Sequence, residues 1–231
     1  MKTETGISAR AQDYLKSIYL LGKEHEKVMS KELCREMRVS ASSVTSMLKK
    51  LAKMQLAIYN RYGVIRLTLD GKKAALEMIR HHRLLETFLM KVLGYGLDKV
   101  HAEADGLEHI ISEEFEDRIS ALLGSPEYDP HGSPIPGKDG KIIERNLSPL
   151  TDLEPGRKAV VAQLLHRIPA RLKYLEDLGL VPGKEVSIIE QKPCEGPLLV
   201  AIGETVTEYI SHQLAGQILV ISNNIAPHKE G

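Results

Sequence analysis

The spacing of apolar residues predicts three helices near the start of the chain. Between Ala9 and Leu21 the apolar positions recur with the period of a helix. Two shorter helices follow, SKELCREM and ASSVTSMLKKLAKM, and we expect Ser30 and Ser40 to cap them. Because two short helices joined by a tight turn are typical of a helix-turn-helix, the pattern predicts that motif here.

The pattern then predicts a hairpin and further helices. The segment AIYNRYGVIRLTLD carries apolar residues on both sides of a Tyr62-Gly63 turn, which predicts a two-stranded wing. Helical stretches are expected from about Gly71 to Leu93 and from Val100 to about Leu123. Prolines and glycines recur between Gly124 and Gly156, so we expect an ordered linker or an irregular loop.

The last part of the chain has a different pattern. A helix is expected around RLKYLEDLGL, ending at Gly179. The segments VPGKEVSIIEQ, GPLLVAIGETVTEYI and GQILVIS predict the short strands of a small barrel. The fold class is therefore mainly α with a small β domain, and it begins with a winged helix-turn-helix.

The composition is that of an ordinary globular protein. The 231 residues are 42% hydrophobic and 27% charged. No apolar run approaches the roughly 20 residues that a membrane span needs, and the start lacks the apolar core of a signal peptide. We expect a cytoplasmic protein with no membrane partner. Two distant cysteines, Cys34 and Cys194, argue against a disulfide framework and against a thiolate zinc site.

The distribution of charge points to a polyanion. The whole chain has 31 Lys+Arg and 31 Asp+Glu, which by itself argues against nucleic-acid binding. Residues 1–75, however, contain 15 Lys+Arg and 7 Asp+Glu, so this part carries a charge of +8 and the remainder −8. This asymmetry favours a module that binds nucleic acid, joined to a part that prefers cations.

The third predicted helix has a face suited to DNA. Val44, Leu48 and Leu51 follow the i, i+4, i+7 spacing of a core face, and the opposite stripe is polar. For any single lysine, a merely solvated position is the simpler interpretation; the whole set in a helix-turn-helix favours double-stranded DNA. The candidate contacts are Ser40, Ser42, Ser43, Thr45, Ser46, Lys49 and, in the wing, Arg61.

A second set of polar residues has the spacing of metal ligands. In HAEADGLEH, at about 100° per residue, His101, Asp105, Glu108 and His109 fall within an arc of roughly 100° on one helix face. The preceding helix carries His82 and Glu86 one turn apart in HHRLLE. Each residue alone is more simply a solvated or packed side chain, but six such groups on two adjacent helices favour a cation site. Oxygen and imidazole donors without thiolate favour Mn(II) or Fe(II).

Several motifs together resemble the diphtheria toxin repressor family, including its manganese-responsive branch. They are QDYLKSIY, SASSVTSMLKKL, HHRLLE, KVHAEADGLEH, DPHGSPIPG and LKYLEDLGLVPG, and they cover nearly the whole chain. The resemblance implies three domains: a winged helix-turn-helix DNA-binding domain at 1–75, a helical metal-binding and dimerisation domain with a Pro-rich linker at 76–147, and an SH3-like FeoA-type domain at 148–231.

The resemblance also implies ligands. The regulatory site of the family maps onto Asp13, Asp105, Glu108 and His109, and its ancillary site onto His82, Glu86 and His101. Iron-sensing relatives commonly carry Met and Cys where this chain has Asp13 and Asp105, and these two hard carboxylates favour Mn(II) over Fe(II). Lys16 departs from the family pattern, because manganese sensors typically carry a Glu ligand there, which argues against a closely spaced binuclear site.

Two further ligand candidates lie in the linker. Where some relatives have Cys-Pro-His-Gly, this chain has Asp129-Pro130-His131-Gly132, so Asp129 and His131 are candidates for the ancillary metal. Ile168 and Arg171 stand where some members supply ligands from the last domain, and we assign none there.

The function expected from the whole is that of a homodimeric, metal-activated transcriptional repressor of metal-homeostasis genes, not an enzyme. Two equivalent recognition helices would match a palindromic operator. Two alternatives stay open. One is a binuclear-metal hydrolase, which has the same ligand chemistry, although no other catalytic signature is seen. The other is a winged-helix regulator that responds to an organic ligand.

Overall fold

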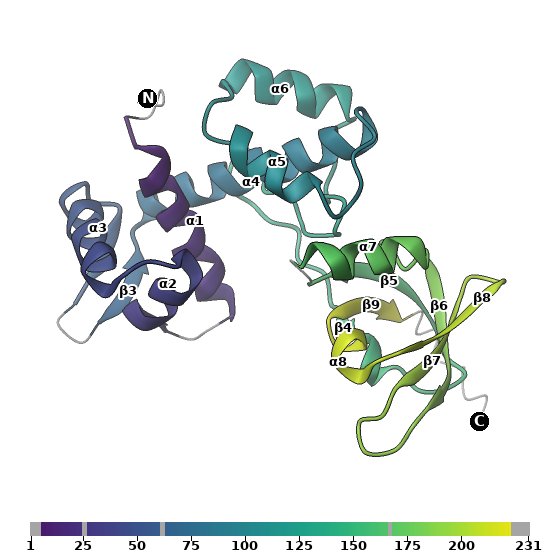
Figure 1. Ribbon diagram of the computed structural model, residues 1–231. Helices are drawn as coiled ribbons and strands as arrows, with labels where there is room; N and C mark the ends of the chain where they lie inside the picture. Colours follow the sequence, from purple (N-terminus) through teal and green to yellow (C-terminus); the bar gives the residue numbers. More distant parts are fainter. Residues whose placement is uncertain (1–5, 25–26, 61–62, 166–167, 223–231) are drawn as a thin grey trace, which may run out of the picture. The chain divides into compact units, whose positions relative to one another are not determined.

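A computed structural model describes residues 6–24, 27–60, 63–165 and 168–222 (Figure 1). The chain divides into two compact units, and the division passes through two of its helices. One unit contains Met1–Leu85, Ala102–Glu127 and Ile135–Ile142, and the other contains Glu86–His101, Tyr128–Pro134 and Ile143–Gly231.

The first unit begins with the predicted helix-turn-helix and wing. Its helices are α1 (Ala9–Glu24), α2 (Ser30–Met37) and α3 (Ala41–Lys53), as Figure 1 shows. Strands β1 (Val28–Met29), β2 (Ala57–Tyr59) and β3 (Val64–Leu67) form an antiparallel sheet in the order β1-β3-β2. The residues of its core that are 2% exposed or less include Tyr14, Leu33, Leu48, Leu51 and Ile65.

The two predicted helix caps have different outcomes. The Ser40 hydroxyl accepts a hydrogen bond from the Ser43 N–H at 3.3 Å, so its role as the cap of α3 is confirmed. The expected cap at Ser30 is wrong. Met29 is the N-cap of α2, because Met29 ends β1 and its N–H donates to the Glu32 carboxylate at 2.9 Å. Ser30 is therefore the first helical residue.

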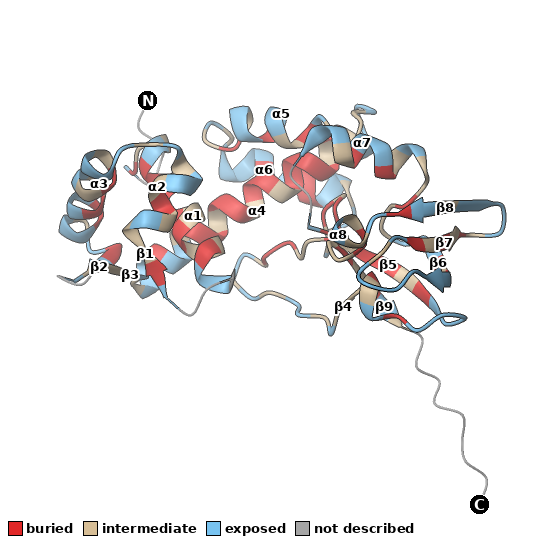
Figure 2. Cartoon of the chain, turned by 60° about the horizontal axis from the view of Figure 1, so that its bottom comes forward, coloured by how far each residue is buried: buried red, intermediate tan, exposed pale blue. Residues whose placement is uncertain are grey.

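The middle of the chain contains α4 (Leu69–Lys91), α5 (Val100–Leu107) and α6 (Glu113–Leu122). The single helix expected from Val100 to Leu123 is wrong, because the chain turns after Leu107 and the Ser112 hydroxyl accepts from the Phe115 N–H to start α6. Buried positions recur along α4 (Figure 2). Of the helices described, none is long and apolar enough to cross a membrane.

The second unit contains the predicted small β domain. An antiparallel sheet of six strands runs in the order β4-β9-β5-β6-β7-β8 (Figure 1). Its elements are β4 (Ser148–Pro149), the 3₁₀ helix η1 (Leu150–Asp152), β5 (Lys158–Leu164), α7 (Pro169–Asp177), β6 (Glu185–Gln191), β7 (Leu198–Ile202), β8 (Val206–Ile210), α8 (His212–Ala215) and β9 (Ile218–Ser222). Leu97, which precedes α5, is fully buried in the same core.

The segment rich in prolines and glycines is irregular but ordered. Between α6 and β4 the described backbone forms turns and one isolated bridge, Tyr128 to Pro134. Asp129 and His131 in this segment are buried. A loop that buries two ionisable side chains must give them partners, because an unpaired charge is costly away from water.

Candidate metal centre

The predicted ligands gather into overlapping groups rather than one set. Within the described residues, the candidate ligand atoms of each group lie within 4.8 Å of one another. The groups are Asp13, Glu108 and His109; His82, Asp105 and Glu108; His82, Glu86 and His101; and Glu86, Asp129 and His131. The structure thus brings every predicted ligand close to at least two others.

The first group joins α1 to the turn that follows α5. The Asp13 carboxylate lies 2.8 Å from His109 Nε2, and one Glu108 oxygen lies 3.6 Å from the same nitrogen. The other ring nitrogen of His109 lies 3.0 Å from the amide oxygen of Gln12. This contact orients the ring so that Nε2 faces the two carboxylates. Gln12 was not predicted, since a buried glutamine beside an acidic residue has no sequence signature of its own.

Asp105 lies in a different group from Asp13. Its carboxylate is 3.2 Å from the Lys16 ammonium and 3.3 Å from His82 Nδ1. The ammonium also donates to both oxygens of Glu108, at 2.7 and 2.8 Å. The predicted regulatory set of Asp13, Asp105, Glu108 and His109 is therefore divided, with the buried Glu108 carboxylate common to both groups.

The backbone at the end of α5 explains why Asp105 and Glu108 lie on the same side of the helix. Although α5 ends at Leu107, the Glu108 N–H still donates to the Ala104 carbonyl at 2.9 Å. Glu108 therefore keeps helical register, three residues after Asp105 on the same side. The ring nitrogen of His101 lies 3.0 Å from Glu86, with which the family resemblance groups it.

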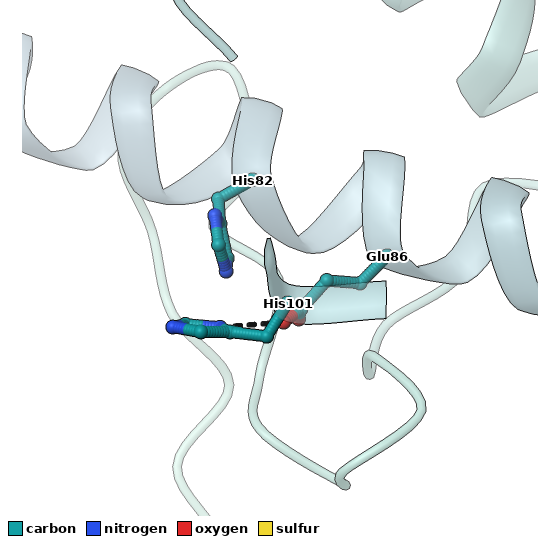
Figure 3. A group of neighbouring side chains, drawn as sticks. All are labelled: His82, Glu86 and His101. Carbon is teal, nitrogen blue, oxygen red and sulfur yellow. Dashed lines mark hydrogen bonds and ion pairs between the residues drawn. The ribbon is translucent and has the colours of Figure 1, made fainter. Parts of the chain in front are cut away.

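A second cluster surrounds Glu86. Figure 3 shows His82 and Glu86 one turn apart on α4, with His101 against the Glu86 carboxylate. The other Glu86 oxygen lies 3.7 Å from His131 Nδ1. Burial alone would lower the pKa of His131, but the pairing with Glu86 and the charge of Asp129 outweigh it and leave that pKa raised.

The loop that carries Asp129 and His131 is held by its backbone. Asp129 Oδ1 accepts from the N–H groups of His131 and Ser133, at 2.9 and 2.8 Å. Gly132 has φ +85°, and a Cβ there would lie 2.0 Å from the Ala162 carbonyl oxygen, so only glycine fits. The Arg145 guanidinium donates to the Gly132 and Ala162 carbonyls. These contacts hold the loop in place.

A buried ion pair that the sequence did not predict lies behind Glu108. His81 Nε2 is 2.8 Å from the Glu116 carboxylate, and His81 Nδ1 is 3.2 Å from the Glu108 carbonyl oxygen. Arg80 contacts the same Glu116 carboxylate at 2.5 Å. Burial disfavours the charged form of both side chains, but their hydrogen bonds and opposite charges outweigh it. The pKa of His81 is therefore raised and the pKa of Glu116 is lowered.

The candidate DNA face of α3 has the predicted division. Val44, Leu48 and Leu51 are fully buried. Of the candidate contacts, Ser40, Ser42, Ser46 and Lys49 are exposed and Ser43 and Thr45 half-buried, whereas Arg61 lies outside the described residues. Two hydroxyls already serve the helix: Ser40 caps it, and Thr45 Oγ1 donates to the Ala41 carbonyl at 2.8 Å.

Three parts of the chain match known protein families. Residues 6–65 match the family described as iron dependent repressor, N-terminal DNA binding domain. Residues 68–137 match iron dependent repressor, metal binding and dimerisation domain, and residues 148–222 match the FeoA domain. These matches imply DNA and a second copy of the chain as partners.

Whole relatives match as well. The iron-dependent repressor IdeR of Mycobacterium leprae (strain TN) is 30% identical over 220 residues, which are 90% of this chain and 94% of the relative. The diphtheria toxin repressor of Corynebacterium glutamicum (strain ATCC 13032) is 27% identical over 193 residues, 78% and 83% of the two chains. A solved manganese-dependent transcriptional repressor in complex with manganese is 38% identical, with a TM-score of 0.83 over 92% of this chain and 99% of that one. The protein therefore belongs to the diphtheria toxin repressor family of metal-dependent transcriptional repressors.

Proposed function

We propose that this protein is a Mn(II)-activated repressor of metal-homeostasis genes, acting in the cytoplasm as a homodimer on a palindromic operator. The observation that carries the proposal is the group of Asp13, Glu108 and His109. Asp13 belongs to a helix of the DNA-binding domain, whereas Glu108 and His109 follow α5 in the metal-binding and dimerisation domain. One ion at this group would connect the two domains.

The donor set fits a hard divalent cation. Two carboxylates and one imidazole, with no thiolate among them, suit Mn(II) and Fe(II) better than Cu(I) or a structural Zn(II). A bound cation would supply the positive charge that holds Asp13 and Glu108 together. The carboxylate of Asp105 adds a further hard oxygen nearby.

Two relatives bear on which metal is the physiological one. The solved relative that is 38% identical is described as manganese-dependent, and the curated relative that is 30% identical is described as iron-dependent. The carboxylates of Asp13 and Asp105 favour manganese. We therefore take Mn(II) as the activator and Fe(II) as the second candidate.

The residues of α1 explain how metal binding reaches DNA. Tyr14 and Leu15, next to Asp13, are fully buried in the core that also contains Leu48 of α3. A constraint on Asp13 therefore restricts the helix against which the DNA-reading helix packs. A metal that favours the DNA-competent position must tighten DNA binding by the factor by which DNA tightens metal binding.

The cluster around Glu86 is proposed as an ancillary site. Glu86, Asp129 and His131 are all buried, and His82 and His101 adjoin Glu86. An ion held there would stabilise the fold, because a ligand that binds only the native state adds to its stability.

On α3, Ser42, Ser46 and Lys49 are the proposed contacts to DNA, and Arg61 is a further one in the wing.

The test measures DNA binding as a function of metal. Metal-stripped protein is titrated onto labelled DNA from its own upstream region by fluorescence anisotropy, with Mn(II), anaerobic Fe(II), Zn(II) or chelator at one salt concentration. We expect Mn(II) to tighten binding, and Asp13→Asn to lose most of this gain. Glu114→Gln is the matched control, since Glu114 is 74% exposed and pairs with Arg118 on α6.

Equal binding with chelator and with Mn(II) would overturn the proposal. A response to Fe(II) at lower concentration than to Mn(II) would keep the mechanism and change the metal.

A further inference from the structure

Lys16 lies inside a group of metal-capable side chains. Its Nζ is 2.7 and 2.8 Å from the two Glu108 oxygens, 3.2 Å from Asp105 Oδ1 and 3.4 Å from His82 Nδ1. His82, Asp105 and Glu108 are themselves one of the groups whose donor atoms converge within 4.8 Å. An ammonium thus occupies the position that a cation bound by these three residues would take.

Burial makes this ammonium important for the charge balance. Glu108 is only 1% exposed, and the side chain of Lys16 is 16% exposed. A buried carboxylate needs a compensating charge, and Lys16 supplies one with two hydrogen bonds. The same carboxylate extends toward His109, whose ring contacts Asp13. Glu108 therefore stands between two adjacent cation positions, one of them filled by the chain itself.

The count of charges matches one divalent ion. Asp13, Asp105 and Glu108 carry three negative charges when ionised, and one ammonium with one divalent cation neutralises them. A second divalent ion beside Lys16 would bring excess positive charge and would have to displace the ammonium from its hydrogen bonds. Changing Lys16 to an acidic residue would give four negative charges, which two divalent ions neutralise.

We propose that Lys16 is a built-in cation that fills the second of these positions and so limits this centre to one divalent ion per subunit. The inference rests on the proposed metal response of Asp13, Glu108 and His109. It assigns to Lys16 a role in the number of ions bound, and through its bonds to Glu108 and Asp105 a metal-independent link between α1 and α5.

The test counts bound Mn(II) in the full chain. A Glu86→Gln background removes the ancillary cluster from the count, and the variants Lys16→Glu, Lys16→Met and Lys16→Arg are made within it. Lys23→Glu is the matched control, because Lys23 is an exposed lysine in the last turn of the same helix. Equilibrium dialysis with elemental analysis gives ions per subunit, and electron paramagnetic resonance distinguishes an isolated Mn(II) from an exchange-coupled pair.

We expect one isolated ion per subunit with Lys16, with Lys16→Arg and with Lys23→Glu. With Lys16→Glu we expect two ions and a coupled spectrum. If Lys16→Glu does not fold without metal, Lys16→Met provides the test instead, since it removes the cation without adding a carboxylate. We expect this variant to bind a second Mn(II) with lower affinity.

Two outcomes would contradict the inference alone: two coupled ions while Lys16 is present, or one ion with Lys16→Glu and with Lys16→Met. Absence of any bound ion in the Glu86→Gln protein with Lys16 present would instead overturn the proposed function.

Discussion

The two candidate metal clusters of this protein are built in opposite ways. The centre at Asp13, Glu108 and His109 takes its side chains from α1 and from the turn after α5, and the Asp13 side chain is 39% exposed. The cluster at Glu86, Asp129 and His131 is buried at every member. Its loop is fixed by Gly132 and by the guanidinium of Arg145.

This difference suits the two clusters to different tasks. A site preformed by the backbone binds without reorganising the protein, so its binding free energy mainly stabilises the fold. A site whose ligands come from two domains, here the DNA-binding domain and the metal-binding domain, can bias their relative position, because the ion binds one arrangement better than the others. We therefore expect the first centre to control DNA binding and the second to control stability.

The largest effect on DNA binding is expected from Glu108→Gln. This change removes the negative charge of the carboxylate that belongs both to the group with Asp13 and His109 and to the group with His82 and Asp105. The gain in DNA affinity on adding Mn(II), expected to be about 5- to 150-fold for a coupling of this kind, should fall to nearly none. Fluorescence anisotropy with and without metal measures the gain. Glu103→Gln, an exposed position on α5, is the control and should keep it. An undiminished gain in Glu108→Gln would remove the regulatory role of this centre.

A different pattern is expected from Glu86→Gln. Mn(II) should stabilise this variant less against heat, because the contribution of the Glu86 cluster is lost. At a free Mn(II) concentration of 100 times the Kd, one site contributes about 2.7 kcal/mol. The gain in DNA affinity should largely remain. Melting curves recorded by circular dichroism at several Mn(II) concentrations measure the first quantity. If Glu86→Gln abolishes the DNA response as completely as Glu108→Gln, the two clusters act as one and the comparison fails.

The pH dependence of stability tests the buried ion pair of His81 and Glu116, which lies next to the Glu108 backbone. The pKa of His81 is raised in the folded protein. Its contribution to the free energy of unfolding is therefore complete below the unfolded-state pKa of 6.5 and is lost as the pH rises through the folded-state pKa. The pKa of Glu116 is lowered, so its contribution is present above 4.5 and is lost as the pH falls through the folded value. The pair should therefore stabilise most at about pH 5 to 6.

The variant His81→Gln isolates this contribution. Urea unfolding with chelator present should show the largest loss of stability, about 1 to 2 kcal/mol, near the middle of that window. The difference from the unsubstituted protein should shrink as the pH rises through the raised pKa of His81, because the ring is then neutral in both the folded and the unfolded state. A difference that does not change with pH would mean that His81 contributes by packing and not by charge.

The sequence predicted those features that depend on local spacing. The burial of Val44, Leu48 and Leu51 follows from helical period, and the common side of Asp105 and Glu108 follows from residues three apart. Prediction failed where tertiary pairing decides. The helix after β1 begins at Ser30 because Met29 pairs with Val64. One local signal was also missed: the Ser112 hydroxyl caps α6 by accepting from the Phe115 N–H, which interrupts the long helix expected from Val100.

The site was predictable only in part for the same reason. The ligand types and their helical spacing were visible, whereas the contacts of Lys16 join residues 89 and 92 positions apart, which no local pattern reveals. The proximity of His131 to Glu86 likewise depends on a loop that needs Gly132 against Ala162. Family resemblance could suggest Asp13 as a ligand, but it could not place the ammonium of Lys16 against Glu108.

The smallest effect on metal coupling is expected from Lys49→Ala on the DNA face. Lys49 is exposed on α3, and an ammonium there contacts phosphate rather than base edges. DNA affinity should fall several-fold with Mn(II) and with chelator alike, and the slope of log affinity against log salt should decrease by about 1. Lys192→Ala, an exposed lysine after β6, should change neither quantity. The gain on adding metal should stay the same in both variants, because neither side chain contacts Asp13, Glu108 or His109. A gain reduced in Lys49→Ala would mean that metal coupling depends on the DNA-reading surface as well as on the first centre.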